Sequence, residues 1–91
     1  MLIEYSPITA LNRTYALAQV KGKKPAIIEA EKLNLADNHF YFSLLGYLHT
    51  DVDNMKAIEN FEIALTLAMT NADKSTITKK LDDLKAKKNN S

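Results

Sequence analysis

The chain has 91 residues, 46% of them hydrophobic and 25% charged, which suffices for one folded domain and leaves no room for a second core. It contains no cysteine, and this excludes disulfide bonds and thiolate metal sites. Its formal net charge of +1 gives no overall electrostatic field that would attract nucleic acid or a membrane surface.

The spacing of apolar residues predicts five helices and no sheet. The first helix is expected to begin at the Ser6-Pro7 pair, which suits a helix start, and to end at Gly22. A second, short helix is expected to begin at Pro25, and residues 36–38 form a polar break. The other three helices are expected at residues 39–50, 54–69 and 72–88. The sequence therefore predicts an all-α fold.

The first helix pair and the second share a pattern at a fixed offset of 34 positions. The matched residues are Ile8 and Phe42, Leu11 and Leu45, Tyr15 and His49, Ile27 and Phe61, Ala30 and Ala64, and Leu33 and Leu67. A period of 34 is that of the tetratricopeptide repeat (TPR), a helix–turn–helix unit whose hairpins stack. The alternative is an unrelated five-helix bundle in which this spacing is a coincidence.

Residue types at the matched positions also favour the TPR interpretation. That repeat has a bulky residue, a Leu-Gly pair and an aromatic in its first helix, and Ala, Phe and Ala in its second. The second hairpin supplies these as Phe42, Leu45, Gly46 and His49, followed by Ala57, Phe61 and Ala64. We therefore expect one domain with TPR-like hairpins at residues 6–34 and 39–69, and a capping helix at residues 72–88.

The segment SPITALNRTYALAQVKG, residues 6–22, resembles a specific family. It is similar to the C-terminal extension of one group of extracytoplasmic-function (ECF) sigma factors of bacterial RNA polymerase, and Leu-Asn-Arg at 11–13 is its most specific part. Residues 61–65 and 71–73, with the basic helix that follows, resemble the closing segment of that family. The resemblance implies a TPR-like accessory domain that follows the two sigma regions which bind core polymerase and promoter DNA. Its implied partners are those sigma regions or core RNA polymerase.

No catalytic arrangement emerges from the residues that carry chemistry. His39 and His49 lie ten positions apart on one expected helix, so their side chains do not share a face. No nucleophile–base pair is suggested, and both histidines are expected in the core or at its boundary. The sequence therefore predicts a protein that is not an enzyme and needs no cofactor.

Metal and nucleic-acid sites are not expected either. Residues 51–62 carry carboxylates spaced as in a calcium loop, but Lys56 stands where such a loop needs glycine. Asp and Asn there are expected to cap a helix instead. The lysines at 21–24 and 79–88 lack interleaved aromatic residues, and we expect solvated faces rather than direct binding of nucleic acid.

The concave face of the stacked hairpins is the best candidate for binding a partner. Counting from the anchors Ile8 and Phe42, the residues expected to face this groove are Thr9, Arg13, Leu17, Phe40, Ser43, Tyr47 and Thr50. Arg13 is the only arginine in the chain, and its planar fork suits a carboxylate on a partner. The alternative role for Arg13 is an internal ion pair with Glu4 or with an acid of the second helix.

Three functions are compatible with these expectations. The first is a protein–protein interaction domain of an ECF sigma factor, as the resemblance implies. The second is a free-standing TPR-like adaptor that binds a peptide or protein in its groove, and the third is a fragment of an enzyme whose active site lies elsewhere. Residues 1–13 lack the features of a signal peptide, and no apolar run approaches the ~20 residues of a membrane span, so a cytoplasmic location is expected.

Overall fold

The computed structural model describes the backbone of residues 7–89 and the surroundings of side chains 9–86, and this part of the chain contains five helices and no strand. The helices are α1 (Pro7–Lys21), α2 (Lys23–Leu33), α3 (His39–His49), α4 (Asn54–Leu67) and α5 (Asn71–Asn89). Helices α1 and α2 form the first hairpin, and α3 and α4 form the second. The all-α fold predicted from the sequence is confirmed.

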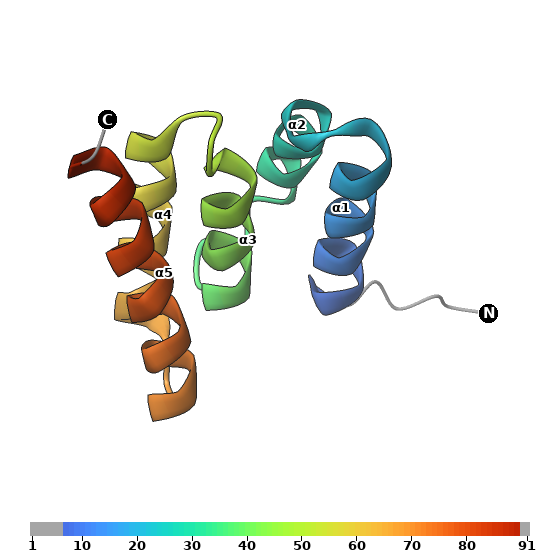
Figure 1. The fold of residues 1–91 in the computed structure, drawn as a ribbon. Coiled ribbons are helices and arrows are strands. Elements are labelled where there is room, and N and C mark those ends of the chain that lie inside the picture. Colours follow the sequence, from blue (N-terminus) through green and yellow to red (C-terminus); the bar gives the residue numbers. More distant parts are fainter. Residues whose placement is uncertain (1–6, 90–91) are drawn as a thin grey trace.

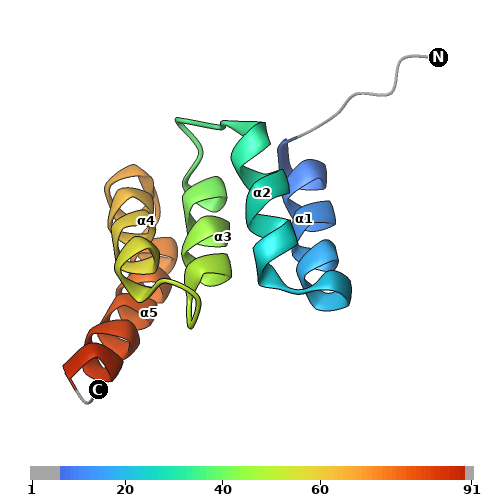
Figure 2. The same ribbon diagram turned by 90° about the horizontal axis from the view of Figure 1, so that it is seen from above.

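The hairpins stack along one direction, and the last helix covers the far end (Figures 1 and 2). The first hairpin lies at one end of an elongated molecule of 52 × 31 × 17 Å, with α3 beside it. Helix α3 packs against both helices of the first hairpin and against α4, and α5 packs against α4. The molecule is therefore two stacked TPR-like hairpins with a capping helix.

The 34-residue step holds at most of the matched residues that pack in the core but not at the aromatic position, where Tyr15 is 48% exposed and His49 is 6% exposed. Leu11 and Leu45 are each 6% exposed, and Ala30 and Ala64 are both completely buried. The small side chains of the two alanines let neighbouring helices approach closely. The anchor Ile8 lies outside the described side chains. Equivalent packing of matched residues is what a structural repeat requires.

The two hairpins differ in their turns. Gly22 alone separates α1 from α2, and its φ of 96° lies in the left-handed region that favours glycine. In the second hairpin, residues 50–53 separate α3 from α4. Helix α2 begins at Lys23, two residues before the predicted start at Pro25, because proline is tolerated within the first turn, where backbone N–H groups have no partner inside the helix.

Side chains cap the helices of the second hairpin. The Asn38 carboxamide oxygen accepts a hydrogen bond of 2.9 Å from the Phe40 N–H, and the Asp53 carboxylate accepts one of 3.3 Å from the Lys56 N–H. Helix α4 ends at Leu67 rather than at 69, because Ala68 has the extended backbone angles φ −65° and ψ 135°. The cap predicted for Ser6 lies outside the described residues.

The core has two clusters of buried side chains. One joins the first hairpin to α3, and the other joins α4 to α5. Phe42 and Tyr47, both on α3, pack against both clusters. Helix α3 is therefore the element that connects the two halves of the molecule.

Candidate functional site

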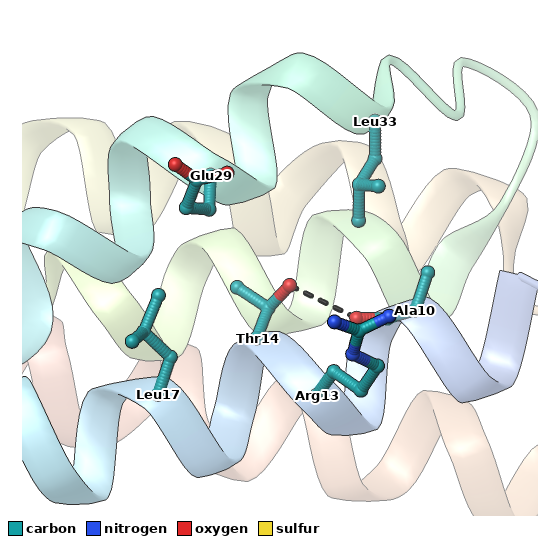
Figure 3. Close-up of a pocket in the computed structure, with 6 residues that line it drawn as sticks. All are labelled: Ala10, Arg13, Thr14, Leu17, Glu29 and Leu33. Carbon is teal, nitrogen blue, oxygen red and sulfur yellow. Dashed lines mark hydrogen bonds between the residues drawn. The ribbon is translucent and has the colours of Figure 1, made fainter.

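The predicted groove residues separate into different hollows of the surface. Arg13 and Leu17 line a hollow of about 410 Å³ between α1 and α2. Its other lining residues are Ala10, Thr14, Glu29 and Leu33 (Figure 3). We call this the end hollow, because it lies at the outer end of the first hairpin. Thr9, close to the start of α1, is exposed and is not among the residues that line it.

The end hollow has an apolar floor and a charged rim. The Thr14 hydroxyl donates a 2.9 Å hydrogen bond to the Ala10 carbonyl oxygen within α1, so its one donor hydrogen is used inside the helix. Leu17 and Leu33 are half-buried and form apolar walls. Arg13 and Glu29 are exposed and supply one charge of each sign. Such a surface suits an apolar side chain flanked by polar groups on a partner protein.

Phe40 lies in a separate crevice of about 290 Å³ between α1 and α3. Leu11, Asn12, Tyr15 and Leu44 line this crevice with it. Tyr15 and Phe40 are each 48% exposed, although both are large hydrophobic residues. The crevice therefore presents two aromatic rings to solvent.

Tyr47 serves the contact between the two hairpins. Its ring centroid lies 5.3 Å from that of Tyr15, and its hydroxyl oxygen accepts a 3.0 Å hydrogen bond from the Gln19 side-chain amide. With Thr50 it also borders a third hollow of about 170 Å³, lined as well by Phe61, Lys80, Asp83 and Leu84. Ser43 is half-buried and is not among the residues that line these three hollows.

Lys23 has an interhelical role that the sequence analysis missed. Its ammonium group donates a 3.0 Å hydrogen bond to the Thr50 carbonyl oxygen, which follows the last residue of α3. The same group lies 4.8 Å from the centre of the Tyr47 ring. A cation stabilises the negative end of a helix dipole and the face of an aromatic ring. No periodic pattern predicts this contact, because it depends on the one-residue turn at Gly22.

The two histidines have different surroundings. His39 Nε2 lies 3.3 Å from a carboxylate oxygen of Asp73, a close contact without the angles of a hydrogen bond. His49 is 6% exposed, and its Nδ1 has no hydrogen-bond partner among the described side chains. Nor does any group of three His, Cys, Asp or Glu side chains within the described residues form a possible metal site.

Burial makes the free energy of unfolding depend on pH through His49. Desolvation lowers the pKa of His49 below its ordinary value of 6.5, the positive charge of Lys56 lowers it further, and Glu31 and Asp53 oppose the shift. The His49 imidazole therefore binds a proton more readily in the unfolded chain than in the folded one. Its neutral form contributes fully to the free energy of unfolding above about pH 6.5, and this contribution is lost as pH falls below that value. We expect urea midpoints to decrease from pH 7.5 to 5.5, and His49→Gln to make this decrease shallower. An equal decrease in both chains would contradict the assignment to His49.

Comparison with known proteins gives no assignment. No helix in the described part of the chain is long and apolar enough to cross a membrane. No protein-family model, no curated protein and no solved structure matches this chain.

Proposed function

We propose that this chain is a non-catalytic protein–protein interaction domain that binds its partner through the end hollow. The observation that carries the proposal is the difference between the two ends of the stack. Helix α5 packs on the second hairpin with Ile77, Leu81 and Leu84 buried, whereas the end hollow lies on the first hairpin with charges at its rim. Helical repeats characteristically use their extended surfaces for binding rather than for chemistry.

In its more specific form, the proposal is that the domain belongs to a bacterial ECF sigma factor and works in the cytoplasm during transcription initiation. This step is supported by the resemblance of residues 6–22 to that family. The most specific part of the resemblance is Leu-Asn-Arg at 11–13. In the structure Leu11 is in the core, Asn12 lines the crevice between α1 and α3, and Arg13 lines the end hollow. The expected partners are the two sigma regions that precede such a domain, or core RNA polymerase.

A free-standing adaptor is the second candidate, and the crevice between α1 and α3 favours it. Exposed aromatic rings are frequent anchors for bound peptides, and Tyr15 and Phe40 both line this crevice. An adaptor of this kind would bind apolar peptides there and would not distinguish a sigma factor from other proteins.

The experiment is an equilibrium binding measurement with purified proteins. The ligands are a fragment containing the two sigma regions of an ECF factor from the group that this chain resembles, core RNA polymerase, and a set of unrelated apolar peptides. Saturable binding to the sigma fragment or to core polymerase is the expected result. Binding to the peptides alone would contradict the sigma-factor proposal and favour the adaptor.

Arg13→Ala separates a binding role of this residue from a structural one. Arg13 is exposed, and a polar interaction at the surface contributes little, so we expect its removal to lower the free energy of unfolding by no more than about 1 kcal/mol. If Arg13 contacts a partner carboxylate, affinity should fall by roughly tenfold or more. Lys79→Ala is the matched control, since it removes an exposed positive charge on α5. A large fall in melting temperature with unchanged affinity would show that Arg13 acts inside the fold.

A further inference from the structure

The internal repeat indicates what kind of partner the end hollow accepts. Arg13 and Tyr47 are 34 positions apart and occupy the same place on the first helix of their hairpins. Ala10 and Thr14 correspond in the same way to Leu44 and Leu48. The end hollow is thus the counterpart, on the first hairpin, of the face by which the second hairpin packs on the first.

The occupied counterpart shows the contacts that this face makes. Leu44 and Leu48 are buried in the cluster that joins α3 to the first hairpin. Tyr47 meets Tyr15 and Gln19 of α1, and Lys23 of α2 lies over its ring. The face therefore receives both helices of a preceding hairpin, through two buried leucines and through the ring, hydrogen-bond and cation–π contacts of Tyr47.

Three substitutions between the counterparts define how the occupant of the end hollow must differ. Ala10 and Thr14 replace two leucines, which leaves a depression where the second hairpin has projecting side chains. Arg13 stands where the second hairpin has Tyr47. If the occupant carried a lysine equivalent to Lys23, that lysine would meet the positive charge of Arg13 instead of an aromatic ring. A carboxylate at that place would attract Arg13, and a bulky apolar side chain would fill the depression.

We propose that the end hollow binds a helical hairpin that packs as the first hairpin packs on α3, and that carries a carboxylate where the first hairpin carries Lys23. The inference rests on the proposed function and deepens it by naming the surface and the chemistry of its occupant. The carboxylate pairs with Arg13 at the rim, and an apolar side chain of the occupant lies over Ala10 and Thr14. Glu29, on the opposite rim, is paired at 3.1 Å with Lys32 of its own helix.

An extended chain supplies the probe. Residues 7–38 are duplicated and joined ahead of residue 5, which keeps the 34-residue step between the added hairpin and the first one. Four versions combine Lys or Glu at the Lys23 position of the added copy with Arg or Glu at position 13 of the original first hairpin. Their urea unfolding is followed by circular dichroism, and amide hydrogen exchange reports protection in the added hairpin.

The expected result is a single unfolding transition in which the added hairpin is protected. With Arg13 present, the version with Lys23→Glu should unfold at a higher urea concentration than the version with lysine. With Arg13→Glu this order should reverse, because the lysine of the added hairpin then faces a glutamate and the Lys23→Glu version brings two negative charges together. Separate unfolding of the added hairpin, or an order that does not reverse, would overturn the proposal.

One further variant shows whether the joint itself permits packing. Ala10→Leu with Thr14→Leu in the extended chain restores the apolar pattern of Leu44 and Leu48. If this variant unfolds in one transition and the four charge versions do not, the connection to residue 5 allows the added hairpin to pack, but the natural end hollow does not accept it. That outcome refutes the inference. Because no sigma factor or polymerase takes part, this outcome is distinct from failure of the binding measurement under the proposed function.

Discussion

Phe61→Ala is expected to lower the free energy of unfolding by about 3–5 kcal/mol, a large part of the stability of a domain of this size. Phe61 is only 2% exposed, and its ring belongs to the cluster that joins α4 to α5. It also lies against the backbone of α3 at Gly46. Removing the ring leaves a cavity between three helices.

Urea denaturation followed by circular dichroism measures this effect. The control is Ile63→Ala on the same helix, because Ile63 is 42% exposed and should cost much less. Loss of native signal for the Phe61 variant in the absence of urea would still agree with the expectation. Similar urea midpoints for the two variants would contradict the central packing role of Phe61.

Gly46→Ala is expected to destabilise the fold even though alanine is a better helix former than glycine. A Cβ at position 46 would come within 2.7 Å of ring atoms of Phe61, which is too close for any real contact. The ring is buried and cannot move aside freely, so overpacking should cost ~1–3 kcal/mol. The gain in helix propensity is about 1 kcal/mol, which is the lower end of that cost, so we expect a net destabilisation of up to about 2 kcal/mol.

A double-mutant cycle identifies the clash as the cause. Phe61→Leu shortens the side chain that opposes position 46, so Gly46→Ala should cost less in that background than in the natural one. Ala16→Gly, at an exposed position of α1, gives the helix-propensity term separately. An equal cost of Gly46→Ala in both backgrounds would show that the ring is not what excludes the methyl group.

Much of the fold could be predicted because it depends on local periodicity. Apolar residues at steps of three and four, together with Gly22 and the polar break at 36–38, indicated five helices with small errors at their ends. The 34-residue step predicted that Leu11 and Leu45 are buried alike, which is confirmed, and that Tyr15 and His49 are equivalent, which is wrong because Tyr15 is 48% exposed and His49 is 6% exposed. The apolar spacing and the 34-residue step both arise from side chains that face a neighbouring helix in each hairpin, so they can be read from the sequence alone.

The candidate site was harder to predict, because it depends on what lies beside each hairpin. Equivalent positions of a repeat have different surroundings at its end and in its middle. Tyr47 packs on the first hairpin, whereas its counterpart Arg13 borders the end hollow. The expected continuous groove therefore divides into separate hollows. The role of Lys23 was also hidden, since it depends on the tight turn that brings α2 close to the end of α3.

The most direct test of the account is an NMR titration of this chain, labelled with ¹⁵N, with the fragment that contains the two sigma regions. We expect chemical-shift changes to concentrate at the end hollow, on the amides of Arg13, Leu17, Glu29 and Leu33. Changes concentrated instead at Tyr15 and Phe40, or an absence of changes at saturating fragment, would contradict the proposal that this end of the stack is where the partner binds.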